Sequence, residues 1–364
     1  MPTAEDLFLP AKEPVQLIDG SGSAVDAEGF TRPADDRLLA AYAGLVAARR
    51  LNDQANALVR QGRLAVYPSS HGQEACQVAA AQALEPDDWM FPTYRDTAAA
   101  VARGVDPAEV LVLLKGDWHS GYDPRMKKVA PQATPLATQL LHAVGVAHAA
   151  RLKDEPSVVL AMCGDGATSE GDFHEALNFA AVFQAPVVFF VQNNEYAISV
   201  PLARQSVAPS LAHKGIGYGV PGQRVDGNDV AALLAVLGRA VEVARAGGGP
   251  QLVEAHTYRM QAHTNADDAG RYRHDDEVAA WLDRDPLDRV ETFLRASGAL
   301  TDELATAYAE AAESMAAQVR AALNQDVVPD PGDLFEHVYA ARTTQLAEQA
   351  ALLSDELARQ EEVR

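Results

Sequence analysis

The sequence has few cysteines and no long apolar run. Its 364 residues include only Cys76 and Cys163, whose spacing indicates neither a disulfide framework nor a zinc site, so we expect a reducing compartment, the cytoplasm. No apolar stretch approaches the length that crosses a membrane. The acidic first residues also differ from a secretory signal, in which a basic region precedes an apolar core. These absences argue against a disulfide-rich secreted protein and against a membrane partner.

An excess of basic residues is also lacking. The chain has 30 Lys and Arg residues against 51 Asp and Glu residues, which gives a formal net charge of −21. We expect no nucleic acid partner, because binding along a phosphate backbone requires clustered cations. An acidic surface suits either a basic partner protein or solubility alone.

The composition is that of a globular protein with a sizeable core. Hydrophobic residues make up 48% of the chain and charged residues 22%, and the length allows one large domain with additions or two domains. Residues 1–34 are rich in proline, aspartate and glycine, and we expect an extended arm there. Residues 35–326 are predicted to form an α/β domain. Residues 327–364 are predicted to form a charged helical tail, which either docks on a partner, folds back on its own chain or frays.

Hydrophobic periodicity predicts the main elements of the domain. We expect helices over residues 35–61, 73–83, 97–115, 135–152, 173–182, 230–245 and 301–323. Buried strands are expected over residues 157–163, 187–191 and 252–258, and a further strand ends at 225–227. Residues 262–276 are polar and lack a period, so we expect a mobile loop there.

One stretch, from Gly164 to Asn194, carries the strongest functional signal. A Gly-Asp-Gly turn follows the first buried strand, and an asparagine pair follows the next strand, with one helix between them. A strand–helix–strand unit is a right-handed parallel crossover, so both polar turns should lie at the carboxyl edge of one sheet. Ligands of open α/β sheets usually bind at that edge.

The residues of these two turns suit a divalent cation and a diphosphate. Asp165 offers a carboxylate oxygen and Asn194 an amide oxygen, and Mg²⁺ accepts such ligands together with water and phosphate oxygens. Gly164 and Gly166 allow the backbone to approach a ligand closely, and N–H groups at the following helix start can bind phosphate. An ordinary βαβ unit with a glycine turn would explain the triplet alone, but not the matching asparagine pair.

The GDG triplet and the later NN pair resemble the signature of thiamine diphosphate enzymes. The longer string GDGATSEGD…EALNFAA…NN resembles the alpha subunit of 2-oxo acid dehydrogenases, the decarboxylating component of the pyruvate and branched-chain complexes. Further motifs follow in the family's order across about residues 35–340, namely HGQEA, FPTYRD, PLATQ, RVDGND, YRMQAHTNADD and RYR. The resemblance implies a thiamine-diphosphate-binding α/β fold, a mostly parallel sheet flanked by helices, with a helical C-terminal extension.

The resemblance also implies roles for residues at matching positions. Asp165, Asn194 and the backbone carbonyl of Tyr196 are expected to hold Mg²⁺. The residues expected to contact thiamine diphosphate are Tyr94, Arg95, Pro135, Leu136, Gly164, Asp165, Gly166, Ala167, Asn194 and His263. His263 and His119 are the candidate catalytic histidines, and His119, which lies in a diverging segment, is expected to assist acyl transfer. Gln192 stands where some branched-chain enzymes carry an arginine that faces the phosphates. The glutamine therefore leaves this site with one positive charge fewer.

Finally, the resemblance implies half of a composite active site. In the family the cofactor carries the decarboxylation chemistry, and the glutamate that activates it belongs to a beta subunit. We therefore expect an α2β2 heterotetramer that decarboxylates a 2-oxo acid and passes the acyl group to a lipoyl-bearing acyltransferase core. Branched-chain acids such as 2-oxoisovalerate (3-methyl-2-oxobutanoate) are the first expectation, then pyruvate, then acetoin. Two other classes remain as alternatives. Intact Asp165 and Asn194 argue against a silent scaffold subunit, and the absence of Walker and GxGxxG motifs argues against a plain nucleotide binder.

Overall fold

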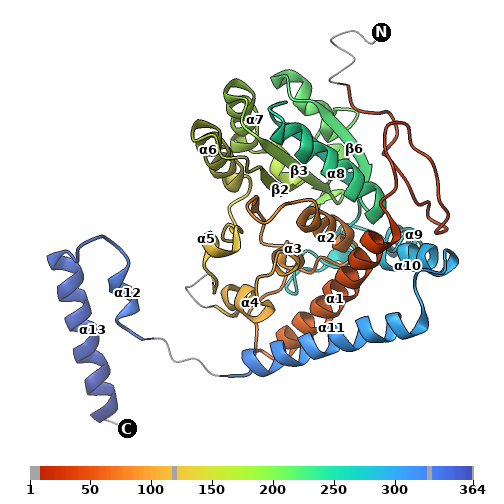
Figure 1. Ribbon diagram of the computed structural model, residues 1–364. Helices are drawn as coiled ribbons and strands as arrows, with labels where there is room; N and C mark the ends of the chain where they lie inside the picture. Colours follow the sequence, from red (N-terminus) through yellow and green to blue (C-terminus); the bar gives the residue numbers. More distant parts are fainter. Residues whose placement is uncertain (1–8, 117–120, 326–329, 363–364) are drawn as a thin grey trace. The chain divides into compact units, whose positions relative to one another are not determined.

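A five-stranded parallel sheet forms the centre of the first of two units in this computed structural model, which describes residues 9–116, 121–325 and 330–362 (Figure 1). The first unit ends at Leu323 and the second begins at Asn324. Neighbouring strands of the sheet follow the order β1-β2-β3-β7-β6 and are all parallel. The strands are β1 (Trp89–Phe91), β2 (Val159–Gly164), β3 (Val187–Asn193), β6 (Gly222–Asp226) and β7 (Gln251–His256), and a separate antiparallel hairpin pairs β4 (Tyr196–Ala197) with β5 (Val200–Pro201).

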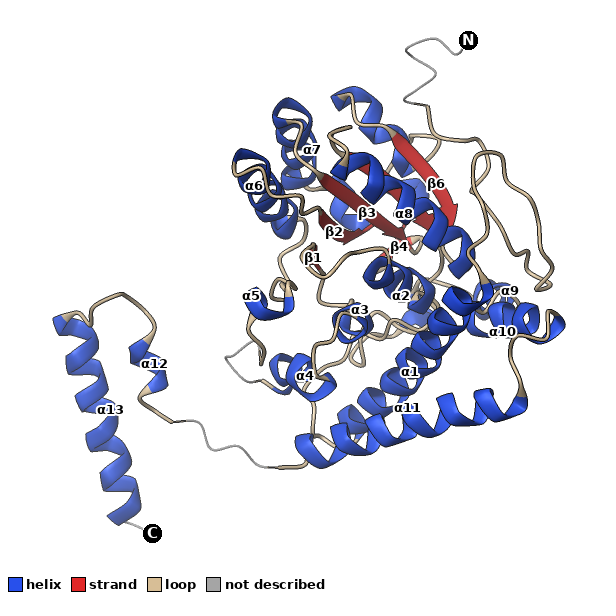
Figure 2. Ribbon diagram, in the orientation of Figure 1, coloured by secondary structure: helices blue, strands red, loops and turns tan. Residues whose placement is uncertain are grey.

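Helices surround this sheet (Figure 2). In the first unit they are α1 (Asp35–Arg60), α2 (Glu74–Gln82), α3 (Thr97–Ala102), α4 (Pro107–Lys115), α5 (Pro124–Lys127), α6 (Thr138–Leu152), α7 (Gly171–Phe183), α8 (Val230–Arg245), α9 (Asp275–Leu282), α10 (Pro286–Ala296) and α11 (Asp302–Leu323). Short 3₁₀ turns occupy Gly166–Ser169, Leu202–Arg204, Leu211–Tyr218 and Ala269–Arg271.

Successive residues of the central strands face two different cores, because side chains of a strand alternate between its faces. In β2, Ala161 and Cys163 join a core formed with α6 and α7, whereas Leu160 and Met162 join a larger core that includes α1, α2 and α8. Burial on both faces explains why these strands read as continuous apolar runs. The predicted fold class, a mostly parallel sheet flanked by helices, is confirmed.

Two of the predicted helices differ from the observed ones by more than two residues. The single helix expected over 97–115 is wrong, because α3 ends at Ala102 and Gly104 adopts a left-handed φ of 89°. A new helix then begins at Pro107, with Asp106 as its N-cap accepting hydrogen bonds from the backbone N–H groups of Ala108 and Glu109. The helix expected from residue 135 begins only at Thr138, after a left-handed residue at position 137.

The described part of the N-terminal arm packs against the sheet edge rather than standing free. Val15 forms a parallel bridge with Val225 of β6, and Leu17 and Ile18 are buried. Asp229 holds this segment, because its Oδ2 accepts hydrogen bonds from the backbone N–H groups of Leu17 (2.7 Å) and Ile18 (2.8 Å). The other oxygen of Asp229 caps α8, so one buried carboxylate joins the arm to the helix.

The second unit contains α12 (Asp333–Glu336) and α13 (Thr344–Glu362). In α13, Leu346, Ala350, Leu353 and Leu357 are partly buried while their neighbours are exposed. Their spacing of four, three and four residues places them on one face of the helix. The helical C-terminal extension expected from the sequence is confirmed.

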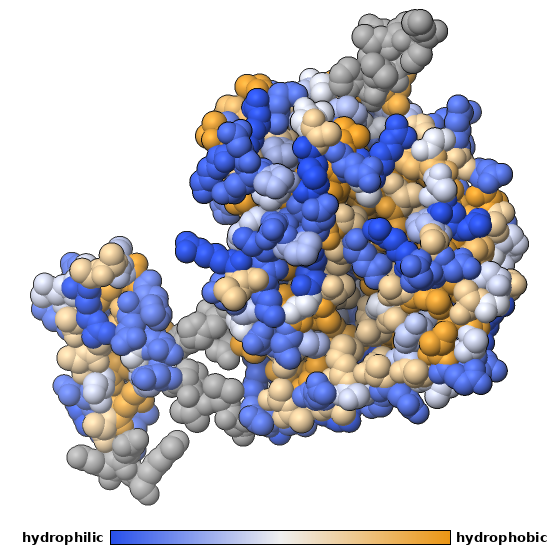
Figure 3. Space-filling view, in the orientation of Figure 1, coloured by the Kyte–Doolittle hydropathy of each residue, from blue (hydrophilic) through white to orange (hydrophobic). Residues whose placement is uncertain are grey.

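The surface of the protein is largely hydrophilic in the view of Figure 3, with smaller apolar areas between the polar side chains. Among the described residues, no helix combines the length and the apolar character needed to span a membrane.

Candidate active site

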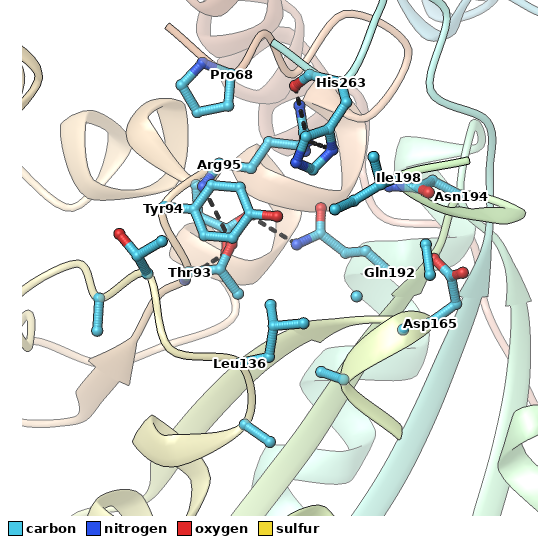
Figure 4. A pocket seen from close by; sticks show the side chains of 18 of the residues that line it. Pro68, Thr93, Tyr94, Arg95, Leu136, Asp165, Gln192, Asn194, Ile198 and His263 are labelled. Atoms are coloured by element: carbon cyan, nitrogen blue, oxygen red, sulfur yellow. Dashed lines mark hydrogen bonds between the residues drawn. The ribbon is translucent and has the colours of Figure 1, made fainter. Parts of the chain in front are cut away.

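A cavity of about 460 Å³ opens at the carboxyl edge of the sheet (Figure 4). The parallel register pairs Gly164 at the end of β2 with Gln192 near the end of β3. This pairing brings the Gly-Asp-Gly turn beside the asparagine pair, although about thirty residues separate them in sequence. Figure 4 shows Asp165 and Asn194 on one side of the cavity, with Tyr94 and Arg95 across from them.

Three oxygen atoms converge on the Asp165 side of the cavity. Asn194 donates from its Nδ2 to Gln73 Oε1 (2.9 Å), which turns its Oδ1 toward the site. The amide atom at that position lies 3.1 Å from Asp165 Oδ1 and 3.1 Å from the Tyr196 carbonyl oxygen. Reversing the amide would give these two oxygens a donor, but it would then set the Asn194 oxygen against Gln73 Oε1. A cation between the three oxygens satisfies all of these groups without reversal.

The composition of this group matches a magnesium site rather than a zinc site. Within the described ranges, no cluster of three or more His, Cys, Asp or Glu side chains is arranged for a metal. One carboxylate, one amide and one carbonyl leave room for water and phosphate oxygens, as Mg²⁺ requires. Asp165 is 1% exposed, and this burial raises the pKa of its carboxyl group, although a hydrogen bond from Gln205 opposes the shift. A bound cation would offset the cost of burying this charge.

The two glycines of the turn meet different surroundings. A Cβ at position 164 would meet no atom within 4 Å, so this part of the backbone is open toward the cavity that it lines. A Cβ at position 166 would lie 2.7 Å from the Cβ of Ala197 in the hairpin. Gly164 therefore leaves room for a ligand, and Gly166 lets the turn pack against β4, the strand that contains Tyr196.

Arg95 places a buried positive charge on the opposite wall. Its guanidinium donates to the carbonyl oxygen of Ser69 (2.8 Å) and to that of His263 (3.1 Å), and it also contacts His263 Nδ1 (3.0 Å). The side chain is only 6% exposed, and among the described residues no carboxylate forms an ion pair with it. A fixed, unpaired guanidinium that lines a cavity suits an anionic ligand such as a phosphate.

A chain of buried amides links the two walls. Gln73 Nε2 donates to Gln192 Oε1 (3.2 Å), and Gln192 Nε2 donates to Asp96 Oδ1 (2.7 Å). The other carboxylate oxygen of Asp96 accepts from the backbone N–H and the hydroxyl of Thr93, both at 2.7 Å. Burial raises the pKa of Asp96 despite these bonds. Through its bond to Asp96, Gln192 therefore holds the turn that carries Tyr94 and Arg95.

His263 is held as a neutral imidazole. Arg95 has only donors, so His263 Nδ1 must accept, and the ring proton lies on Nε2. Burial is the main cause that lowers the pKa of His263 to about 4, and the positive charges of Arg95 and Arg259 lower it further. The backbone N–H of His263 donates to Asp267 (2.8 Å), which fixes the polar loop at this point. The loop expected over 262–276 is irregular apart from the short turn Ala269–Arg271, but it ends two residues earlier than expected because α9 begins at Asp275.

The remaining walls are mostly apolar. They include Val66, Pro68, Leu114, Pro135, Leu136 and Ile198. Leu136 is 42% exposed, and Figure 4 shows its side chain on the side of the cavity opposite Pro68 and His263. This apolar part can accept a flat or aliphatic group, whereas the polar ends receive charge.

The structure brings together nearly all residues that the sequence singled out. Tyr94, Arg95, Pro135, Leu136, Gly164, Asp165, Gly166, Ala167, Asn194, Tyr196 and His263 all line the cavity. His119 lies outside the described residues. The sequence did not predict the roles of Gln73, Asp96 and Gln205. The HGQEA and FPTYRD motifs contain the first two, but Gln205 lies in no recognised motif.

Comparison with known proteins identifies the family of this chain. A family model described as the dehydrogenase E1 component matches residues 43–328. The chain is 47% identical, over 95% of both chains, to a 3-methyl-2-oxobutanoate dehydrogenase alpha subunit of Mycobacterium tuberculosis. It is 37% identical to a pyruvate dehydrogenase E1 component alpha subunit of Staphylococcus aureus, over 86% of this chain and 84% of the relative. The resemblance drawn from the motifs is confirmed: the chain belongs to the dehydrogenase E1 component family.

Proposed function

We propose that this protein is the alpha subunit of a thiamine-diphosphate-dependent dehydrogenase that oxidatively decarboxylates branched-chain 2-oxo acids. The observation that carries the proposal is one cavity with an oxygen cluster at one end and, at the other, the Arg95 guanidinium, which has no ion-pair partner among the described residues. The choice of substrate is supported by the relative named for 3-methyl-2-oxobutanoate, which is more similar to this chain than the pyruvate relative is.

The residues of the cavity fit the cofactor in three parts. Asp165, Asn194 and the carbonyl of Tyr196 would hold Mg²⁺. Tyr94, Arg95 and the backbone of residues 164–167 would hold the diphosphate, and Pro135 and Leu136 would line the aminopyrimidine side. When bound, thiamine diphosphate supplies the electron sink for decarboxylation. The chain itself supplies anchoring charge, an apolar wall and exclusion of water.

We assign His263 a catalytic role at the mouth of this site. With Nδ1 held by Arg95, its Nε2–H is the donor that faces away from Arg95, and a neutral imidazole can donate a hydrogen bond from it to a developing negative charge. His119 is proposed as a second catalytic histidine, which assists transfer of the acyl group to the lipoyl carrier.

We propose that the active complex is an α2β2 heterotetramer that serves a lipoyl-bearing acyltransferase core. Relatives are named as alpha subunits, which implies a further subunit in those enzymes. Exposed apolar residues on α6 and α7, namely Leu152 (72%), Phe179 (45%) and Val182 (69%), give this unit a surface suited to a protein contact. In this proposal the catalytic domain spans residues 35–326, with the arm 1–34 and the tail 327–364 as additions.

The substrate is tested on the alpha chain assembled with its beta subunit from the native source. We expect kcat/KM for 2-oxoisovalerate to exceed that for pyruvate by at least ~10-fold, since one or two extra methyl groups in an apolar pocket contribute ~1–3 kcal/mol each. The isolated alpha chain should show no turnover and serves as the control. A preference for pyruvate would favour the pyruvate enzyme, a preference for acetoin the acetoin enzyme, and absence of cofactor binding a silent scaffold.

A further inference from the structure

Gln205 touches the carboxylate that would hold the cation. Its side-chain Nε2 donates to Asp165 Oδ2 (2.6 Å) and also to the carbonyl oxygen of Val200 (2.9 Å). The first bond occupies one oxygen of the carboxylate and leaves the other, Oδ1, 3.1 Å from the Asn194 amide, which also lies 3.1 Å from the Tyr196 carbonyl oxygen. Gln205 therefore helps to set which oxygen of Asp165 faces Asn194.

The same amide joins Asp165 to the hairpin that carries Tyr196. Tyr196 pairs with Pro201 across the hairpin, and the N–H of Leu202 donates to the carbonyl of Glu195 (2.9 Å), closing its base. Gln205 follows the short 3₁₀ turn Leu202–Arg204, and its N–H donates to the Leu202 carbonyl (2.9 Å). Two of the three candidate ligands are thus connected through one side chain, although forty residues separate Gln205 from Asp165.

The second atom of this amide lacks a partner. Gln205 Oε1 is buried, and no hydrogen-bond donor within the described ranges satisfies it. A buried acceptor without a donor is costly, and a bound water or ion is one of the groups that satisfies such atoms in native proteins. Mg²⁺ keeps several of its water ligands when it binds a protein, and each such water is a strong donor.

We propose that Gln205 is a positioning residue for the magnesium site, which orients Asp165 through Nε2 and accepts a hydrogen bond from a metal-bound water through Oε1. The inference rests on the proposed function, because it requires a cation between Asp165, Asn194 and Tyr196. It assigns to Gln205 the role of an outer-shell partner, whose loss typically reduces metal affinity ~10- to 100-fold.

The test compares Gln205→Met with wild type in the alpha chain co-expressed with its beta subunit. Met preserves length and removes both hydrogen-bonding groups. The exposed Gln345→Met, on α13, is the matched control. Dissociation constants for Mg²⁺ and for Ca²⁺ are measured by titration calorimetry at saturating thiamine diphosphate. We expect Gln205→Met to weaken Mg²⁺ binding by at least ~10-fold and Ca²⁺ binding less, because Mg²⁺ demands a stricter geometry.

The outcomes separate this inference from the function on which it rests. If wild type binds neither cation with the cofactor, the proposed function fails. If wild type binds and Gln205→Met retains the same Mg²⁺ affinity, the role of Gln205 is refuted. An equal loss for both cations, accompanied by a lower melting temperature without cofactor, would indicate a structural role only and also refute it. Should the Met variant fail to fold, Gln205→Asn, which retracts the amide by one methylene, gives the same comparison.

Discussion

Asp165 illustrates how a single residue trades stability for binding. Its carboxylate is buried and its pKa is raised by that burial, and among the described side chains only Gln205 donates to it. We predict that Asp165→Asn raises the melting temperature of the cofactor-free protein, because a neutral amide is cheaper to bury than a charge. The same change should abolish the additional stabilisation by Mg²⁺ and thiamine diphosphate.

Both effects are measured in one thermal denaturation series with and without ligands. A gain of 1 kcal/mol corresponds to roughly 2 °C in a chain of this size. If Asp165→Asn still showed the full ligand-dependent shift, this carboxylate would not be a cation ligand.

His263 predicts a pH dependence with a defined sign. Its pKa is lowered from 6.5 to about 4 in the folded protein, so the unfolded chain binds a proton that the folded chain refuses between these values. The contribution of His263 to stability is therefore present above pH ~6.5 and is lost as the pH falls toward ~4. Between pH 7 and pH 5 we expect the free energy of unfolding to fall by about 1 kcal/mol less in His263→Gln than in wild type. This figure is smaller than the full pKa shift would give, because the ring is part-exposed and solvent screens its interactions.

The comparison uses free energies of unfolding from urea titrations of the cofactor-free protein. Asp96 and Asp165, whose pKa values are raised, act in the opposite direction but equally in both proteins, so they cancel in the difference. His142→Gln, an exposed site on α6, is the control. Parallel pH profiles for wild type and His263→Gln would contradict the prediction.

At the scale of the element, the glycine turn and the β4–β5 hairpin act as one unit. A Cβ at Gly166 would lie 2.7 Å from the Cβ of Ala197, so Gly166→Ala must push the hairpin away. We predict a lower melting temperature and weaker Mg²⁺ binding, since the Tyr196 carbonyl moves with the hairpin. Gly166→Ala combined with Ala197→Gly should recover most of both losses, and a double-mutant cycle measures that recovery.

The same substitution, glycine to alanine, should raise the stability of the protein at Gly145. Gly145 lies inside α6, and a Cβ there would meet nothing within 4 Å. Gly145→Ala should stabilise the protein by about 0.5–1 kcal/mol, because alanine restricts the unfolded chain and favours helix. Equal effects of the two substitutions would show that the contact with Ala197 is unimportant.

The elements that could be predicted from the sequence are those with long, regular patterns. Helix α8 was predicted at its observed bounds, because Asp229 marks its start and apolar residues recur along it. The break between α3 and α4 was missed although Gly104 and Pro107 signalled it. Strand β1 is only three residues long, too short for a periodic signal.

In the site, too, some residues could be predicted from the sequence and others could not. Motif residues such as Arg95 and Asn194 were predicted because their neighbours in sequence resemble a known pattern. Gln192 contacts Asp96 across 96 residues, and Gln205 contacts Asp165 across 40. Such pairs depend on which loops the fold brings to one edge, and a single sequence does not specify this.

At the scale of the whole molecule, the first unit closes its core before the tail begins. Helix α11 buries Ala312, Ala316, Val319 and Leu323. Arg320 also donates to Gln54 of α1 (2.8 Å). We predict that a chain ending at residue 325 keeps the melting temperature of the full chain within ~2 °C, whereas a chain ending at residue 300 unfolds at a much lower temperature.

Both truncations are compared by calorimetry on the alpha chain alone. A large loss of stability in the chain that ends at residue 325 would show that the tail contributes to the core. The beta-binding affinity of the same protein then reports separately whether residues 327–364 serve assembly.

The pairing of Gly164 with Gln192 restricts how relatives of this chain can change in length. One residue added inside β2 or β3 would displace a ligand-bearing turn by ~3.3 Å and turn every later side chain to the wrong face. Insertions and deletions between the two turns should therefore be confined to α7 and its connections, because a change of length there leaves the hydrogen-bonded pairing of β2 with β3 unaltered. The number of residues between the two motifs can therefore change during evolution, whereas the lengths and the pairing register of the two strands that precede them cannot.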